Sequence, residues 1–535
     1  MPTASQRKAD SFVPKVDRGM LHKRDTILIL DFGGQYCHLI ARAVREHSVY
    51  SEIVGYDITA TEIEKLQKDM NVKGIILSGG PQSVYGEDAQ SIDKSILDLG
   101  IPILGLCYGH QLIAHLARGD VQPAPKKEFG DTTIVIDKPT ALLNGLDTTT
   151  KVWMSHSDSV VKLPEDYEVM AHSENTPVAA FRHKTLPIFG LQWHPEVVQT
   201  EQGAVIMKNF VVDICKSKQE WKMENLVESA LAEIRSIVGK GRCVVALSGG
   251  VDSSVAAALV GKVIGSNLIA VYVDTGLMRE GETEEIRETF KNFGVTLKII
   301  DAKEQFLKAL KGVRDPEKKR KIIGKKFVRI FEREAKGINA DFLVQGTIYP
   351  DRVESGATGK SAVIKTHHNV GGLPKNIKFK FVIEPLRDLY KDEVRKLAVE
   401  LGLPESIVHR QPFPGPGLAI RIIGTVTEEK IALVKKADFI VRDEIEKAGL
   451  ARGLWQYFAV LTDTKAVGVK GDTRAYGNVI AWRALVSREA MTAKFAELPW
   501  VLIRKISTRI TNEVPGITRV VYDTTDKPPG TVEWE

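Results

Sequence analysis

The feature that most constrains the fold of this chain is a series of short apolar segments, followed by glycine-bearing turns and helical stretches. The first of them, TILILDF at residues 26–32, ends at Gly33 and Gly34. Strands that alternate with helices in this way are typical of parallel α/β sheets. The other segments lie at residues 74–78, 101–106, 243–247, 267–274 and 296–301.

The length of 535 residues exceeds what one hydrophobic core supports, about 250–300 residues, so we expect several domains. We predict a polar N-terminal tail at residues 1–24 and two successive parallel-sheet α/β domains at residues 25–218 and 219–408. A small α+β C-terminal domain is expected at residues 409–535. Further strands of the first domain are expected at residues 132–136, 177–181 and 187–192, with a helix near 202–215.

Composition excludes several classes of protein. The formal charge of +6 is modest for this length and does not imply a nucleic-acid partner. We expect no membrane association, because no apolar run reaches about 18 residues. The four cysteines form no CxxC pair, which argues against a zinc ribbon and fits reduced thiols in the cytosol. One stretch, residues 311–336, is locally basic, with 11 Lys or Arg against 4 Asp or Glu.

A reactive cysteine is predicted in the motif GLCYGHQ at residues 105–111, where a strand runs directly into a helix. Gly105 and Gly109 flank Cys107 at a spacing of two, so the backbone can form the sharp turn that exposes a nucleophile. The start of the helix would favour the thiolate form of Cys107. The alternative is a buried structural cysteine beside a tight turn.

A base for this nucleophile is available in LQWHPE at residues 191–196, where Glu196 can orient His194. LSGGP at residues 77–81 places glycines after a strand, and the N–H of Gly80 together with that of Tyr108 could form an oxyanion hole. Three such elements in one α/β segment favour a catalytic site over an isolated surface histidine.

Residues 25–215 resemble a class I, triad-type glutamine amidotransferase. The resemblance implies that Cys107 attacks the glutamine amide, that His194 and Glu196 complete the triad, and that Gly80 and Tyr108 supply the oxyanion hole. MSHSD at residues 154–158 resembles the substrate loop of that family, although Ser157 replaces the usual glycine. The glutamine-binding residues implied in this way are Gln111, Ser155 and His156.

A second site is predicted at SGGVDSS, residues 248–254, between a strand and a helix. Its two glycines and the helix start form a cradle for anions, but the lysine of a Walker A loop is missing. The motif resembles the loop of pyrophosphatases that cleave ATP to AMP and pyrophosphate; a helix-capping turn is the alternative. Asp252 is a candidate Mg²⁺ ligand. The predicted ATP-binding residues are Ser248, Gly249, Gly250, Val251, Asp252, Ser253, Ser254 and Asp274.

Nearly the whole chain resembles the GMP synthetase family, and the segments that carry this resemblance are SGGVDSS (248–254), RKIIG (320–324), QGT (345–347), QPFPGPGL (411–418) and KPPGTVEWE (527–535). The resemblance implies that XMP, ATP and glutamine give GMP through an adenylated XMP, with Mg²⁺. It also implies an adenine-nucleotide alpha-hydrolase-like second domain, and a C-terminal domain that forms a homodimer and completes the XMP site. The predicted XMP-binding residues are Arg320, Lys470, Asp472, Lys527 and Glu533.

The residues alone leave three other classes of function to consider. A tRNA-modifying pyrophosphatase-loop enzyme could use the basic stretch at residues 311–336, but it would need a sulfur relay for thiolation that the cysteine spacings do not offer. A non-catalytic scaffold would carry a degenerate triad or loop, and here both are complete. CTP or carbamoyl-phosphate synthesis fits the first domain alone but not the SGGVDSS loop.

Overall fold

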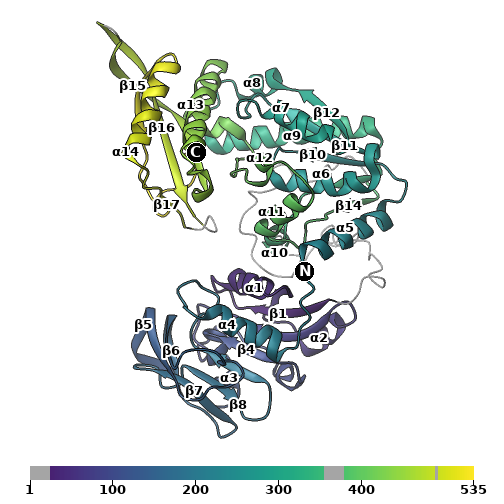
Figure 1. Cartoon of the computed structure of the whole chain (residues 1–535), viewed down its shortest axis with the longest axis vertical. Coiled ribbons are helices and arrows are strands. Elements are labelled where there is room, and N and C mark those ends of the chain that lie inside the picture. The colour runs from purple at the N-terminus through teal and green to yellow at the C-terminus, as the bar shows by residue number, and fades with distance from the viewer. Residues whose placement is uncertain (1–23, 355–378, 471, 488–491) are drawn as a thin grey trace. The chain divides into compact units, whose positions relative to one another are not determined.

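The computed structural model describes residues 24–354, 379–470, 472–487 and 492–535. These residues form two compact units, the first ending at Leu226 and the second starting at Val227 (Figure 1). Helix α5 (Met223–Val238) carries the chain from one unit into the next. The predicted tail at residues 1–24 lies outside the described residues, apart from Arg24.

The first unit contains a nine-stranded sheet with the order β2-β1-β3-β4-β9-β8-β7-β5-β6. The strands from β2 to β9 in this order are parallel, which confirms the α/β prediction. The remaining pairings are antiparallel and include the strands expected after residue 125. The strands are β1 (Asp25–Asp31), β2 (Tyr50–Gly55), β3 (Asn71–Leu77), β4 (Ile103–Leu106), β5 (Asp120–Ile136), β6 (Thr149–Lys162), β7 (Tyr167–Ser173), β8 (Ala180–His183) and β9 (Ile188–Leu191).

Strand β1 shows why the parallel strands of this sheet could be predicted from the sequence. Its residues Ile27, Leu28, Ile29 and Leu30 are all fully buried, so both faces of the strand are covered and the apolar run is continuous. The helical elements of this unit are α1 (Cys37–Glu46), α2 (Ala60–Leu66), the 3₁₀ turn η3 (Lys94–Asp98), α3 (Tyr108–Leu116), α4 (Gly203–Lys208) and the π-helical η4 (Asn209–Ile214).

The order of the parallel strands decides where the first candidate site lies. Strands β3, β4 and β9 are neighbours, and their carboxyl ends lie at the same edge of the sheet. The loops that follow them carry the LSGGP motif, Cys107 and His194 respectively. Three sequence-distant motifs are thereby brought to one edge.

The second unit begins with a five-stranded, entirely parallel sheet of order β12-β11-β10-β13-β14. The central strand β10 precedes the SGGVDSS loop, and its neighbour β11 ends at Asp274. The elements are β10 (Cys243–Leu247), α6 (Val251–Ile264), η5 (Gly265–Asn267), β11 (Leu268–Asp274), α7 (Glu282–Lys291), β12 (Thr296–Asp301), α8 (Lys303–Leu310), α9 (Pro316–Ile338), β13 (Phe342–Val344), α10 (Tyr349–Glu354), β14 (Phe381–Ile383), α11 (Lys391–Glu400) and α12 (Glu405–Val408).

The last part of the chain is α+β, as predicted. A long hairpin of β15 and β16 pairs with β17 antiparallel and with β18 parallel. The elements are η6 (Gly417–Arg421), α13 (Glu428–Lys447), η7 (Ala451–Gly453), β15 (Gln456–Lys470), β16 (Thr473–Val486), β17 (Lys494–Phe495), α14 (Trp500–Glu513) and β18 (Ile517–Tyr522).

One continuous apolar cluster connects the two parts of the second unit. It runs from Val244 and Val271 in the parallel sheet to Trp482 and Ile506 in the C-terminal part. The predicted division at residue 409 therefore lies inside one compact unit. None of the helices in the described part of the chain is both long enough and apolar enough to cross a membrane.

Candidate active sites

Cys107 lies at a sharp turn between β4 and α3, with the positive φ of +53° that is unusual for a residue with a side chain. The flanking glycines are required by close backbone contacts. A Cβ atom on Gly105 would lie 2.4 Å from the carbonyl oxygen of Gly109, and one on Gly109 would lie 2.5 Å from that of Leu77. The turn thus has the geometry of a nucleophile elbow.

His194 and Glu196 are positioned beside this cysteine. The Nδ1 of His194 lies 2.7 Å from the Oε1 of Glu196, and both side chains are almost completely buried. Burial alone lowers the pKa of His194, but the Glu196 carboxylate and hydrogen bonds with Cys107 and Glu196 raise it, and the resulting pKa is well above its usual value. An imidazole held in this way can keep a proton next to a thiolate.

The glycines after β3 border the same site. A Cβ atom on Gly79 would lie 3.2 Å from the Cε1 of His194 and 3.7 Å from the Cβ of Cys107. One on Gly80 would lie 3.3 Å from the Cγ of Tyr108. The two residues predicted to donate to an oxyanion, Gly80 and Tyr108, are therefore neighbours although they follow different strands.

The predicted glutamine loop also reaches the cysteine, because the main-chain oxygen of Ser155 lies 3.5 Å from the Sγ of Cys107. The side chains of the two other predicted residues bond to the protein itself. His156 contacts the main-chain oxygen of Asp158 at 2.9 Å through Nδ1, and Gln111 donates to the same oxygen at 2.8 Å. The hydrogen bond of Gln111 fixes this loop to α3, and that of His156 stabilises the loop itself.

Sequence reasoning missed the residue that holds His156 in place. Glu128 lies 3.2 Å from the Nε2 of His156 and also accepts from Ser173 and Thr176. Burial lowers the pKa of His156, although Glu128 opposes the effect. No motif surrounds Glu128, which meets its partners only because β5 pairs with β6 and β7.

The SGGVDSS loop adopts the compact turn expected of an anion cradle. Gly249 has a φ of +77°, and Gly250 caps the start of α6. The hydroxyls of Ser248 and Ser253 lie 3.1 Å apart, and Ser253 also donates to the main-chain oxygen of Gly250. The serine side chains thus shape the loop, which leaves the main-chain N–H groups at the start of α6 as the anion donors.

The two carboxylate oxygens of Asp252 differ in their contacts. Its Oδ2 pairs with the ammonium group of Lys391. Its Oδ1 is buried and has no hydrogen-bond partner among the residues that the structure describes. The segment QGT at residues 345–347 packs closely here, since a Cβ atom on Gly346 would lie 3.0 Å from the carbonyl carbon of Asp252.

Two residues that support the loop carried no motif of their own. Arg410 donates from Nη1 to the main-chain oxygen of Gly249 at 2.6 Å and pairs with the buried carboxylate of Glu282. Arg410 stands directly before the QPFPGPGL segment, which was the one available signal. Lys391, at the start of α11, had none.

Asp274 lies at the adjacent strand end, where it accepts from the N–H of Gly276 at 2.9 Å and from Thr283 at 3.1 Å, with Lys303 3.3 Å away. A cavity of about 850 Å³ opens beside it. Asp274 is the only predicted nucleotide residue in the lining of this cavity, whose size suits a nucleotide-sized ligand.

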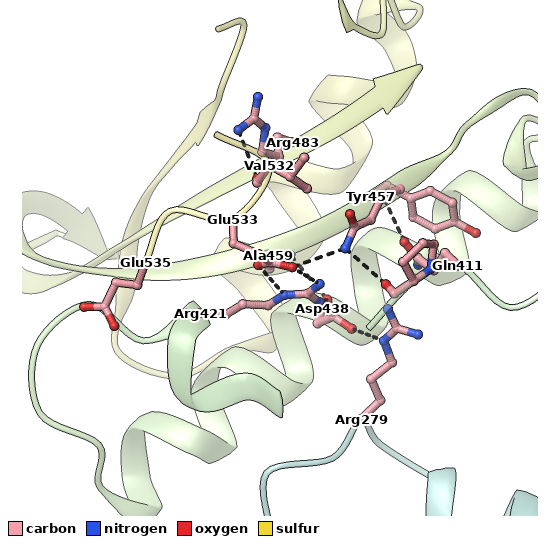
Figure 2. A network of polar contacts seen from close by, with 12 residues as sticks. Arg279, Gln411, Arg421, Asp438, Tyr457, Ala459, Arg483, Val532, Glu533 and Glu535 are labelled. Carbon is pink, nitrogen blue, oxygen red and sulfur yellow. Dashed lines mark hydrogen bonds and ion pairs between the residues drawn. The ribbon is translucent and has the colours of Figure 1, made fainter. Parts of the chain in front are cut away.

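The predicted XMP residues divide into two groups. Glu533 makes a two-pronged ion pair with the buried Arg421, at 2.9 and 3.1 Å (Figure 2). Arg320 donates to the main-chain oxygen of Glu535 at 2.6 Å, and Lys527 exchanges main-chain hydrogen bonds with Ala493. These three predicted residues belong to or contact the segment at residues 527–535, here called the acceptor segment.

Lys470 and Asp472 lie elsewhere. Asp472 is exposed in the turn between β15 and β16, and the side chain of Lys470 lies outside the described residues. Gln456 at the start of β15 donates to Glu533, whereas Lys470 ends this 15-residue strand. At a rise of about 3.3 Å per residue a strand of this length extends up to about 45 Å, so Lys470 and Asp472 lie at the end of the hairpin remote from Glu533.

Arg421, which sequence reasoning missed, is the centre of the polar network in Figure 2. It lies between Glu533 and Asp438, and Arg279 approaches the other oxygen of Asp438 at 3.9 Å. Arg483, also missed, donates to the main-chain oxygens of Thr531 and Val532. Arg421 follows the QPFPGPGL segment closely in sequence, so its position was a signal.

Comparisons with known proteins assign three parts of the chain to known families. The sequence model of the family "Glutamine amidotransferase class-I" matches residues 28–214, and that of "Arginosuccinate synthase N-terminal HUP domain" matches residues 242–314. The model "GMP synthase C terminal domain" matches residues 443–534.

Curated relatives match almost the full length. The GMP synthase [glutamine-hydrolyzing] of Caldicellulosiruptor saccharolyticus is 55% identical, over 96% of this chain and 100% of the relative. That of Carboxydothermus hydrogenoformans is 54% identical, over 95% of this chain and 99% of the relative. That of Caldanaerobacter subterraneus subsp. tengcongensis is 52% identical, over 96% and 99%. The chain therefore belongs to the family of glutamine-hydrolysing GMP synthases.

Proposed function

We propose that this chain makes GMP from XMP, ATP and glutamine, with ammonia released at the Cys107 site and used at the SGGVDSS site. The observation that carries the proposal is the occurrence of both sites in one chain, the first with its His194–Glu196 pair assembled at 2.7 Å. A glutaminase supplies ammonia, and an ATP-pyrophosphatase activates the acceptor that ammonia attacks.

At the first site, the Cys107 thiolate attacks the amide carbon of glutamine, and the N–H groups of Gly80 and Tyr108 stabilise the oxyanion. His194, oriented by Glu196, gives its proton to the leaving nitrogen, and ammonia departs. Water then attacks the thioester with His194 as the base, and glutamate leaves. Ser155, His156 and Gln111 shape the loop that would hold the glutamine.

At the second site, an oxygen of XMP attacks the α-phosphorus of ATP, and pyrophosphate leaves. Ammonia then attacks the carbon that bears the adenylated oxygen, and AMP departs. The main-chain N–H groups at Gly249 and the start of α6 would hold the phosphates, while the N–H of Gly250 donates to the Ser248 hydroxyl at 3.3 Å. Ser248 and Ser253 maintain this loop through their mutual hydrogen bond.

The donor set at this loop fits a magnesium ion bound together with the nucleotide. The buried Oδ1 of Asp252 lacks a hydrogen-bond partner in the described part of the chain, and a carboxylate oxygen is the ligand that Mg²⁺ prefers. The described residues contain no cluster of three or more His, Cys, Asp or Glu able to hold a metal, so phosphate oxygens would complete the site. The ion would neutralise charge on the leaving pyrophosphate.

The acceptor site is assigned to Arg320, Lys527 and Glu533. XMP brings a dianionic phosphate and a purine edge with donors and acceptors, which cations and a carboxylate can recognise. Lys470 and Asp472, at the far end of the hairpin, would serve an acceptor site only from a second copy of the chain. We therefore propose that Lys470 and Asp472 of one protomer contribute to the acceptor site of the other protomer in a homodimer.

A homodimer through the C-terminal part is supported by exposed apolar side chains there. Val469 and Tyr476 on the hairpin are 75% and 70% exposed, and Trp500 and Val501 at the start of α14 are 80% and 79% exposed. Such groups are typical of interaction surfaces. Sedimentation of the enzyme at several concentrations tests whether it is a dimer.

We also infer a cytosolic location, because all four cysteines are buried free thiols.

The division of labour between the sites is tested with Cys107→Ala. Glutamine-dependent GMP synthesis should be abolished, because the thiolate is lost, while synthesis from XMP, ATP and an added ammonium salt should be largely retained. The release of AMP and the formation of GMP are measured with each nitrogen source. Equal loss of both activities would contradict the two-site mechanism.

A further inference from the structure

We propose that Glu535 is a positioning residue for the acceptor site, because it is the counter-ion of the buried Lys319 and thereby holds the acceptor segment in place. This inference rests on the proposed role of the acceptor segment in XMP binding. Glu535 belongs to neither the triad, the ATP loop nor the predicted XMP contacts.

Lys319 is an unusual lysine because its side chain is completely buried on α9. Its ammonium group donates to the main-chain oxygens of Ala419 at 3.2 Å and Ile422 at 2.7 Å, and it pairs with the carboxylate of Glu535. Two neutral carbonyls and one carboxylate thus use the three N–H groups of the ammonium.

One carboxylate of the described part of the chain balances the charge of Lys319. Glu535 is the carboxylate in ion-pair contact with it among the residues that the structure describes. Burial lowers the pKa of Lys319, and Glu535 opposes that effect. A buried ammonium left without its carboxylate is strongly unfavourable, so the charge of Lys319 draws residue 535 into the protein.

Both carboxylate oxygens of the Glu535 side chain and its main-chain oxygen accept hydrogen bonds. Besides Lys319, its carboxylate accepts the N–H of Gly424 at 3.1 Å, and its main-chain oxygen accepts from Arg320 at 2.6 Å. Lys319 and Arg320 come from α9 and Gly424 from the turn after η6. Glu535 therefore joins the acceptor segment to the helix that carries Arg320, itself a predicted XMP residue.

The acceptor segment depends on such contacts for its conformation. All of its residues are described, and apart from an isolated bridge at Lys527 it contains no helix or strand. Arg421 binds its carboxylate at Glu533, and Arg483 binds the main-chain oxygens of Thr531 and Val532 (Figure 2). These anchors precede Glu535, whose contacts with Lys319 and Arg320 are the hydrogen bonds and ion pairs that fix the segment to α9 within the described residues. Release of residue 535 should therefore loosen Glu533 as well.

The test is Glu535→Gln, which keeps the shape of the side chain and removes its charge. Glu535→Asp keeps the charge on a shorter stem, and Lys319→Met removes the buried cation. The matched control is Glu513→Gln, which removes an exposed carboxylate of α14 paired with Arg509. Intact glutaminase activity shows that each full-length variant is folded in its first unit.

Two quantities are measured for each variant: the KM for XMP with ammonium as nitrogen source, and hydrogen exchange of a peptide covering residues 524–535. For Glu535→Gln we expect a KM raised about tenfold or more, a kcat at saturating XMP within about twofold, and faster exchange. Glu535→Asp should restore part of the KM. The double variant Lys319→Met with Glu535→Gln should bind XMP better than Glu535→Gln alone, because no charge remains buried. Glu513→Gln should change nothing.

The outcomes separate this inference from the function on which it rests. Unchanged exchange and unchanged KM in Glu535→Gln would overturn the inference. A raised KM with unchanged exchange would also overturn it, since Glu535 would then act without holding the segment. Faster exchange with an unchanged KM would overturn the inference together with the proposed acceptor role. A second experiment then identifies which part failed: if removal of residues 527–535 leaves the XMP affinity unchanged, the acceptor role is wrong.

Discussion

Replacing Glu196 by Gln is the sharpest perturbation of the triad, because it preserves the shape of the side chain and removes only its charge. Glu196 is fully buried, and its Oε1 lies 2.7 Å from the Nδ1 of His194. Without the carboxylate, burial lowers the pKa of His194 unopposed by its strongest charge partner. The imidazolium that faces the Cys107 thiolate then loses its stabilisation.

The size of the effect follows from this hydrogen bond. A charge-assisted bond contributes about 1.5–3 kcal/mol and a neutral one about 0.5–1.5 kcal/mol, so the exchange removes about 1–2 kcal/mol. That corresponds to about a 5- to 30-fold slower glutaminase, and the full loss of a general base, about 10²–10⁴-fold, is the upper limit. The Oε2 of Glu196 has no hydrogen-bond partner within the described residues, so a Gln amide there would lie unsatisfied and cost the unit about 1–3 kcal/mol of stability.

The assay measures glutamate release, ammonium-dependent GMP synthesis and thermal unfolding of the same variant. We expect slower glutamate release, an alkaline limb of its pH profile shifted to lower pH, and ammonium-dependent synthesis within about twofold of the unsubstituted enzyme. Glu201→Gln, an exposed neighbour, is the control. Glutamate release within twofold of the unsubstituted rate would refute the reasoning, as would an equal loss of ammonium-dependent synthesis.

Three further predictions concern other sites. Gly249→Val should abolish synthesis from either nitrogen source, since φ is +77° and a Cβ would lie 3.2 Å from Arg410, and normal ATP affinity in this variant would contradict the cradle. Removal of residues 527–535 should abolish XMP use and spare glutaminase, which XMP titration and glutamate release measure separately. Burial holds the pKa of His110 at about 3, so the unfolded chain binds the extra proton as pH falls from about 6.5 toward 3 and stability is lost there. His110→Leu should weaken this acid sensitivity in fluorescence-monitored unfolding, and an unchanged acid midpoint would exclude His110 as its source.

Structure that depends on neighbouring residues could largely be predicted from the sequence. Several of the parallel strands were predicted nearly to their ends, with residues 243–247 and 296–301 matching β10 and β12, whereas β2, β13 and β14 were not predicted. The elbow at Cys107 was also predictable, because its glycines, strand and helix are contiguous. The hairpin β5–β6 was mostly missed, since β5 is polar over much of its length and alternates between buried and exposed residues.

Only the tertiary structure decided which charges meet. Lys319 and Glu535 are 216 positions apart, Arg421 and Glu533 are 112 apart, and neither pair has a local signature among the many charged residues of the chain. The same holds for Glu128 behind His156. A motif determines the backbone of its own turn, because the interactions that shape it lie within a few residues. The counter-ion of a buried charge depends on which distant surfaces pack together. The length of the β15–β16 hairpin likewise separates Lys470 and Asp472 from the acceptor segment with which the sequence had grouped them.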